Sequence, residues 1–145
     1  MGDVFTTILE VLENYETAVF EKNVERFMSS FSPDIHLYDC WDDWEIKGIA
    51  QWREVVDAWF NDLRKEGVLL KTAFTDVVVE EHGDLGLVYC AVTYAAHDKS
   101  GEKLRQMTNR FTFGLRKRNE SWSIVHSHSS LPVSSETGNG IFNLK

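Results

Sequence analysis

The chain has 145 residues, of which 43% are hydrophobic and 26% are charged, a composition typical of one folded globular domain. Its formal net charge of −8 opposes binding to a phosphate backbone, and no apolar run reaches the roughly 18 residues that cross a bilayer. We therefore expect neither a nucleic-acid nor a membrane partner. Cys40 and Cys90 form no zinc or redox motif, so we interpret them as reduced thiols of a cytoplasmic protein.

The first third of the chain carries helical periodicity. Residues 3–22 place apolar side chains on one face at a spacing of three and four, which predicts a long amphipathic helix. A second, short helix is predicted over residues 24–31, and Pro33 with Asp34 is expected to end it. A short strand is then predicted at residues 35–39.

A third helix follows a loop over residues 40–47. Gly48 is expected to begin this helix, and Gly67 to end it, because glycine is common just beyond a helix C-terminus. Its apolar stripe includes Trp52 and Trp59, which are most simply core residues.

From residue 68 the period of the pattern changes to two. Turn-forming segments rich in Gly, Asn, Asp and Ser interrupt the alternation. Three helices followed by a meander of long strands predict an α+β fold. The predicted strands are residues 68–81, 85–97, 102–117 and 121–131.

The domain is expected to end near Pro132. We assign residues 1–132 to the folded domain and residues 133–145 to a C-terminal tail rich in Ser, Gly and Asn. Such a tail is expected to be loosely ordered, although Ile141 and Phe142 could dock onto the domain.

The order of these elements resembles the NTF2-like cone fold, and within it the SnoaL-like and ketosteroid-isomerase-like group. The resemblance spans residues 5–132 and is carried by two segments. One is the amphipathic helix that runs into Pro-Asp and a strand ending in Tyr-Asp, at residues 27–39. The other is the closing strand at residues 122–132, which is also similar to the association domain of calmodulin-dependent kinases. The resemblance implies helices packed on a strongly curved, mostly antiparallel sheet that encloses a pocket.

The resemblance also implies roles for three residues. Asp39, at the end of the first strand, matches the general base of the isomerases, and Tyr15 matches their oxyanion-hole tyrosine. Asn109 stands where they have a protonated aspartic acid that donates a second hydrogen bond; an amide can still donate there. Unlike the isomerases, this chain carries histidines in its closing strand.

Those histidines share a predicted face with core residues. Alternate residues of a strand point the same way, which groups Trp122, Ile124, His126, His128 and Ser130. Because the first two are typical core residues, this face is expected to point inward. The inward imidazoles are then either structural groups with satisfied hydrogen bonds or the polar end of a pocket, and we favour the pocket. No helical histidine pair or cysteine set accompanies them, so no metal is expected.

Asp39 and Tyr15 each have a structural alternative to their functional interpretation. Asp39 either serves as a general base whose pKa burial raises, or caps the following loop by accepting backbone N–H groups. Tyr15 lies on the apolar stripe of the first helix, where a core tyrosine with a bonded hydroxyl is equally common.

The two faces of the strand at 102–117 predict different contacts. Asn109 and Phe111 lie on its apolar face, so Asn109 is expected to be hydrogen-bonded inside the domain. Arg110 and Thr112 lie on the other face, which we expect to pair with a second subunit in a homodimer.

Trp41 and Trp44 lie in the loop at the expected pocket mouth, where tryptophans serve recognition. The sequence therefore predicts a small-molecule-binding protein. One hypothesis is an isomerase or cyclase that needs no cofactor and abstracts a proton next to a carbonyl. The alternatives are a non-catalytic ligand-binding or association module and, with less support, a dehydratase. The expected pocket is lined by Tyr15, Asp39, Trp41, Trp44, Trp59, Asn109, Phe111, His126, His128 and Ser130.

Overall fold

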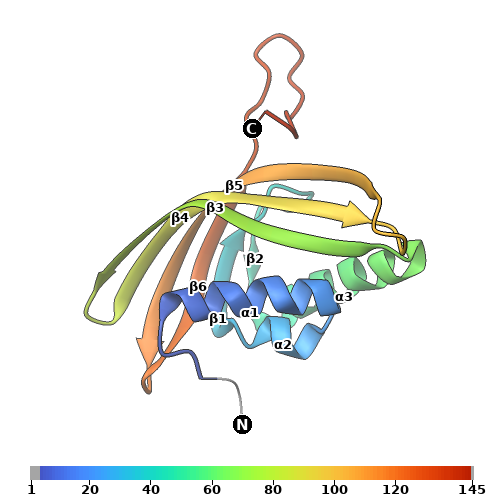
Figure 1. Ribbon diagram of the computed structural model, residues 1–145. Coiled ribbons are helices and arrows are strands. Elements are labelled where there is room, and N and C mark those ends of the chain that lie inside the picture. Colours follow the sequence, from blue (N-terminus) through green and yellow to red (C-terminus); the bar gives the residue numbers. More distant parts are fainter. Residues whose placement is uncertain (1–3, 145) are drawn as a thin grey trace.

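The computed structural model describes residues 4–144 and has helices on one side of a strongly curved sheet (Figure 1). The helices are α1 (Ile8–Glu21), α2 (Val24–Met28) and α3 (Ile49–Glu66). The strands are β1 (Phe31–Tyr38), β2 (Ile46–Lys47), β3 (Leu69–His82), β4 (Leu85–His97), β5 (Lys103–Arg118) and β6 (Ser121–Ser130). None of the helices in the described part of the chain is long and apolar enough to cross a membrane.

The helix ends follow ordinary capping chemistry. The hydroxyl of Thr7 accepts the backbone N–H of Glu10 and begins α1, and Lys22 ends it in a left-handed conformation. Gly48 and Gly67 flank α3 as predicted, and the positive φ of Gly67 (72°) closes the last turn.

The first strand, β1, begins at Phe31, earlier than the predicted start at residue 35. The short helix was expected to continue through residue 31, but it ends at Met28, and β1 begins at Phe31. Phe31 pairs in parallel with Ile124, so a tertiary contact outweighs the helical spacing. Pro33 lies inside β1 rather than before it. Its missing N–H is tolerated because the pairing of β1 with β6 is irregular between Phe31 and His36.

The six strands form one sheet in the order β2-β1-β6-β5-β4-β3. The β1–β6 pair is parallel and all other neighbouring pairs are antiparallel. The strands β3, β4 and β5 are long and bend over the helices (Figure 1). Thus one face of the sheet encloses the apolar interior, and the other faces away from the helices.

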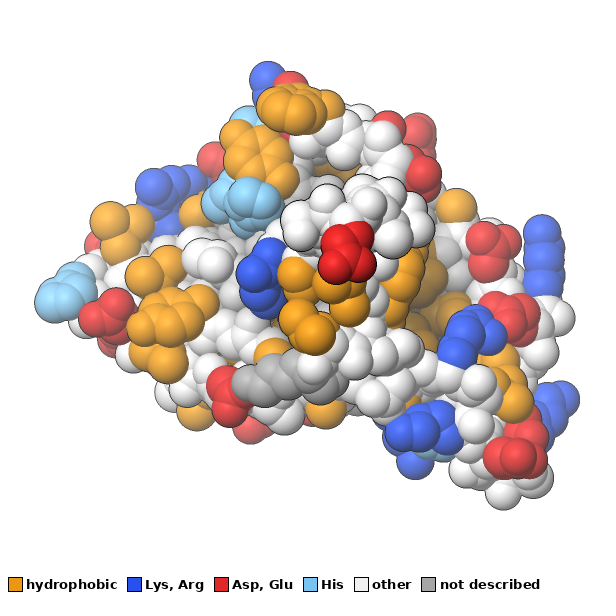
Figure 2. All heavy atoms as spheres, turned by 90° about the horizontal axis from the view of Figure 1, so that it is seen from above, with side chains coloured by type: hydrophobic (Ala, Val, Ile, Leu, Met, Phe, Trp, Pro, Cys, Tyr) orange, Lys and Arg blue, Asp and Glu red, His pale blue; other side chains and the backbone are white. Residues whose placement is uncertain are grey.

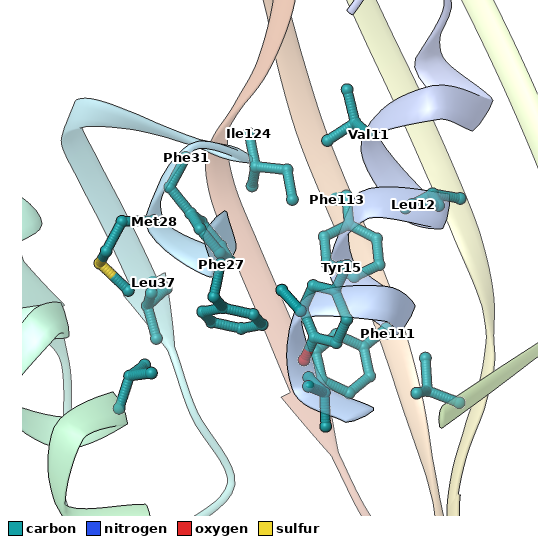
Figure 3. Packing of buried hydrophobic residues seen from close by; sticks show 14 of the residues in the cluster. Val11, Leu12, Tyr15, Phe27, Met28, Phe31, Leu37, Phe111, Phe113 and Ile124 are labelled. Atoms are coloured by element: carbon teal, nitrogen blue, oxygen red, sulfur yellow. The ribbon is translucent and has the colours of Figure 1, made fainter. Parts of the chain in front are cut away.

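Aromatic rings fill the interior between α1, α2 and the sheet. Tyr15 of α1 packs its ring against Phe27 of α2, with centroids 4.7 Å apart, and against Phe113 of β5 at 6.3 Å (Figure 3). Phe27 and Phe113 have no exposed surface. This packing fixes the direction in which the Tyr15 side chain leaves α1.

The C-terminal segment docks on the sheet. The carbonyl of Phe142 accepts the backbone N–H of Thr108 at 3.0 Å, and Ile141 donates its N–H to Pro132 at 2.8 Å. Val133 and Gly140 form an isolated β-bridge that closes the intervening loop. These contacts of Ile141 and Phe142 therefore hold the tail against the domain and restrict its mobility.

Candidate functional site

A cavity of about 740 Å³ lies between α1, α3 and the inner face of the sheet. Its walls are aromatic and aliphatic, and its polar groups come from α1, α3, the C-terminal tail and the strands β1, β4, β5 and β6 or residues just beyond them. Arg105 at the rim makes two hydrogen bonds to Glu66 at 2.7 and 2.9 Å, so its charge is already paired. Side chains that line the cavity include Tyr15, Phe31, Asp39, Trp41, Trp52, Trp59, Tyr94, Asn109, Phe111, Ser129 and Phe142.

Asp39 lies at the polar end of the cavity, directly after β1. Its Oδ1 accepts the backbone N–H of Cys40 at 2.9 Å and the hydroxyl of Ser129 at 3.1 Å. Burial raises the pKa of the Asp39 carboxyl, and these two hydrogen bonds only partly oppose the effect. Asp39 therefore accepts a loop backbone N–H, as its structural interpretation predicts, and it also lines the cavity, while its role as a general base stays a prediction.

The raised pKa of Asp39 predicts a pH-dependent effect on stability. The pKa of Asp39 is higher in the folded protein than in the unfolded chain, so at a pH between these two pKa values the folded state binds more protons. The free energy of unfolding should therefore fall as the pH rises from the unfolded pKa of Asp39 to its folded pKa. We expect Asp39→Asn to raise the melting temperature at about pH 7 by roughly 2–4 °C, and to have little effect at about pH 4. Calorimetry at both pH values measures this, and equal melting temperatures at neutral pH would contradict it.

Two tyrosine hydroxyls meet in the same cavity. The hydroxyl oxygens of Tyr15 and Tyr94 lie 2.6 Å apart, so one hydroxyl donates its proton to the other. Burial raises the pKa of both groups, and the negative charge of Asp39 raises both further. The pair is thus neutral at physiological pH and retains one O–H that can donate to a ligand.

Tyr94 is a site residue that the sequence analysis missed. It lies on β4, where Val92 and Ala96 are buried on the same face. It also pairs directly with Met107 of β5, whose predicted apolar face contains Asn109. The alternation within β4 would have been enough to place Tyr94 inside.

Asn109 is buried as predicted, but its amide has an unexpected partner. Its Nδ2 donates to the sulfur of Cys40 at 3.2 Å. Its Oδ1 is buried and has no hydrogen-bond partner among residues 4–144. One of the two N–H groups of Nδ2, the atom that was expected to stabilise an oxyanion, is therefore directed at a thiol.

The predicted orientation of the closing-strand histidines is wrong. Leu115 pairs with Ile124 but the preceding Gly114 pairs with His126, so β6 has one extra residue at this point. This bulge reverses the alternation. Trp122 and Ile124 remain in the core, and the residues that continue the buried face and line the cavity are Ser127 and Ser129.

His126, His128 and Ser130 therefore lie on the outer face of the sheet, outside the cavity lining. The Nδ1 of His126 is 2.6 Å from the carbonyl oxygen of His36. The rings of both His126 and His128 contact Tyr38, with centroids 5.1 and 5.3 Å apart. No group of three His, Cys, Asp or Glu side chains within residues 4–144 has a geometry that could hold a metal ion.

Of the four aromatic residues that the sequence predicted to bind a ligand, three line the cavity and one does not. Trp59 and Phe111 line the cavity wall, and Trp41 lies at its rim, stacked on Phe142 of the tail with ring centroids 5.6 Å apart. Trp44 is 88% exposed and does not line the cavity. Phe142, which was expected to be able to dock onto the domain, thus also contributes to the cavity wall.

Comparisons with known proteins agree with this architecture. The model of the SnoaL-like domain family matches residues 8–134. An NTF2-like protein of unknown function from Pseudomonas putida KT2440 has a TM-score of 0.81 at 21% identity, covering 95% of this chain and 93% of that one. No curated protein matches the chain.

Two further solved structures carry more specific names. A Xanthomonas campestris protein, provisionally named a calcium/calmodulin-dependent protein kinase II association domain, has a TM-score of 0.70 at 19% identity, covering 85% of this chain and 84% of that one. A Novosphingobium aromaticivorans protein, provisionally named an aromatic ring hydroxylase, has a TM-score of 0.67 at 19% identity, covering 85% of each chain. At these identities the likeness concerns the fold. The family match covers most of the chain, and the chain therefore belongs to the SnoaL-like domain family.

Proposed function

We propose that this protein binds a small, largely aromatic molecule in the cavity and moves a proton next to its carbonyl group. The observation that carries the proposal is that a partly buried carboxylate and a neutral hydroxyl pair line one cavity with aromatic walls. Asp39 supplies the base, and the free O–H of the Tyr15–Tyr94 pair supplies the hydrogen bond to the carbonyl oxygen. This is an isomerase-type or cyclase-type reaction.

The electrostatics of the cavity support this division of roles. A carboxylate with a raised pKa is a stronger base than an exposed one, which suits the removal of a weakly acidic C–H proton. As the proton leaves carbon, negative charge develops on the carbonyl oxygen. A fixed O–H donor in a cavity with aromatic walls stabilises that charge more than water would.

Deuterium exchange tests the proposal without knowledge of the natural substrate. β-Tetralone, an enolisable aromatic ketone, is incubated with the protein in deuterium oxide, and loss of its α-proton signals is followed by NMR. We expect exchange faster than the buffer background and saturable in ketone. Saturable binding without exchange would overturn the catalytic part and leave a ligand-binding protein. Absence of both would overturn the proposal as a whole.

The outer face of the sheet supports a second proposal, that two copies of the chain associate. Leu87 and Tyr89 of β4 are 38% and 46% exposed there, and Tyr89 pairs across the sheet with Thr112 of β5. Arg110 lies on the same face, opposite Ala91. Figure 2, a view from above relative to Figure 1, shows hydrophobic and histidine side chains interspersed with charged ones. A protein of similar fold is named as an association domain.

Size-exclusion chromatography with light-scattering detection, at micromolar protein concentration, measures this association. We expect a homodimer, and we expect Tyr89→Arg to convert it to a monomer, because the new charges would oppose each other near a two-fold axis. Leu9→Arg is the matched control, since Leu9 is 53% exposed but lies on α1. A monomeric wild-type protein, or a Tyr89→Arg variant that stays dimeric, would contradict the proposed interface.

A further inference from the structure

The tail after β6 returns to the sheet and completes one side of the cavity. It projects beyond the end of β6 as a loop (Figure 1), and the carbonyl of Phe142 then accepts the backbone N–H of Thr108 in β5. The last pair of the β5–β6 ladder is Arg110 with Ser130, so this hydrogen bond lies just beyond the ladder. Phe142 thus occupies the position beside β5 that a longer β6 would occupy, and its side chain lines the cavity.

The end of the tail is joined to the domain by contacts that can break without unfolding the sheet. They are the hydrogen bond from Thr108 and the stacking of the Phe142 ring on Trp41, with an interplanar angle of 23°. Other hydrogen bonds, such as that from Ile141 to Pro132, are internal to the segment after β6. A terminal segment held in this way opens at a lower free energy than the strands of a sheet.

The other parts of the cavity rim are held more firmly. Arg105 of β5 bonds Glu66 of α3 through two hydrogen bonds, which connect a strand to a helix. The loop that carries Trp41 is fixed at its base, because the N–H of Cys40 bonds both Oδ1 of Asp39 and the hydroxyl of Ser129. The tail is therefore the part of the rim that can move with the smallest loss of contacts.

We propose that residues 141–143 form a lid on the cavity, latched by the stacking of Phe142 on Trp41, and that a ligand enters and leaves when the tail detaches from β5. The inference rests on the proposed binding of a small molecule in the cavity, but not on proton transfer. Phe142 and Asn143 line the cavity, so detachment of the tail removes part of its wall. Weakening the latch populates the open state both with and without ligand, so association and dissociation both become faster.

Stopped-flow measurement of β-tetralone binding, followed by tryptophan fluorescence, tests the lid. Phe142→Ala removes the stacked ring but keeps the carbonyl that bonds Thr108. We expect the association and dissociation rate constants each to rise at least about fivefold, with the dissociation constant changed by about threefold at most. If only the dissociation rate constant rises, Phe142 is a wall residue and the lid is overturned. Unchanged rate constants would also overturn it.

Two further variants separate the latch from a general loosening of the tail. Phe142→Trp keeps a ring that can stack on Trp41, so it should bind β-tetralone at nearly the wild-type rates. Leu144→Ala is the matched control, because Leu144 belongs to the same tail, is 69% exposed and does not line the cavity. If Leu144→Ala accelerates binding as much as Phe142→Ala does, the ring of Phe142 is not the latch.

Hydrogen exchange of the Thr108 amide reports detachment of the tail without any ligand. In Phe142→Ala we expect this amide to exchange about tenfold faster by NMR, while the amides that pair β4 with β5 keep their protection. Equal exchange of Thr108 in both proteins would overturn the latch. If the wild-type protein does not bind β-tetralone, the proposed function fails and the lid fails with it. Binding with unchanged rate constants removes the lid alone.

Discussion

In Asp39→Asn we expect the catalysed exchange of β-tetralone to fall by roughly 100- to 10,000-fold, the range that one general base contributes. Asparagine has nearly the same size as aspartate, and its Oδ1 can still accept from the N–H of Cys40 and the hydroxyl of Ser129. The cavity and the loop after β1 should therefore stay intact. Affinity for the ketone is expected to change by about threefold at most, because only the proton acceptor has been removed.

Asp62→Asn is the matched control for this prediction. Asp62 is a carboxylate of α3 that also lines the cavity, so its removal changes the local charge by the same amount as the removal of Asp39. We expect its exchange rate to stay within about threefold of wild type. If Asp39→Asn retained the wild-type rate, or if both variants lost the same activity, Asp39 would not be the base.

The pH dependence of the rate offers an independent check. A general base acts when deprotonated, so the rate should rise with pH through the raised pKa of Asp39 and then level off. Burial keeps the pKa of Tyr15 and of Tyr94 above the physiological range, so the donor should not be lost at mildly alkaline pH.

Residue spacing was sufficient to place Asp39 and Tyr15 beside the cavity. Asp39 follows a strand in which the buried Leu37 shares its face, and Tyr15 lies on the apolar stripe of a capped helix. In both cases a regular period connects the residue to the core. The family resemblance and the periodicity therefore agreed for these two positions, although their catalytic roles stay predictions.

The same argument failed for the histidines because it assumes an uninterrupted strand. The extra residue in β6 opposite Gly114 and Leu115 moves His126 and His128 to the outer face. The sequence signal for this bulge is an isolated glycine, Gly114, on the partner strand rather than on β6 itself. The contact of Cys40 with Asn109 was equally hidden, because it joins residues 69 positions apart. The apolar residues of the tail indicated that Phe142 could dock, but not that it would stack on Trp41, because that contact depends on the tertiary structure.

Replacing the tyrosine hydroxyls one at a time should give unequal losses of exchange activity. One hydroxyl of the Tyr15–Tyr94 pair donates to the other, so only one can bond the carbonyl oxygen of the ligand. Removing that donor is expected to lower the maximal rate by roughly 100- to 1,000-fold, as for the loss of one oxyanion-hole donor. Removing its partner should cost less, about tenfold, because the donor survives but loses the hydrogen bond that polarises it.

Tyr15→Phe, Tyr94→Phe and the double variant together form a double-mutant cycle for this expectation. Because the two hydroxyls act as one unit, the double variant should be about as slow as the slower single variant, rather than show the product of the two losses. Phenylalanine preserves the ring contacts of Tyr15 with Phe27 and Phe113, so loss of packing is not expected to contribute. Wild-type rates in both single variants, or independent and multiplicative losses, would show that the pair does not act as a single donor to the carbonyl oxygen.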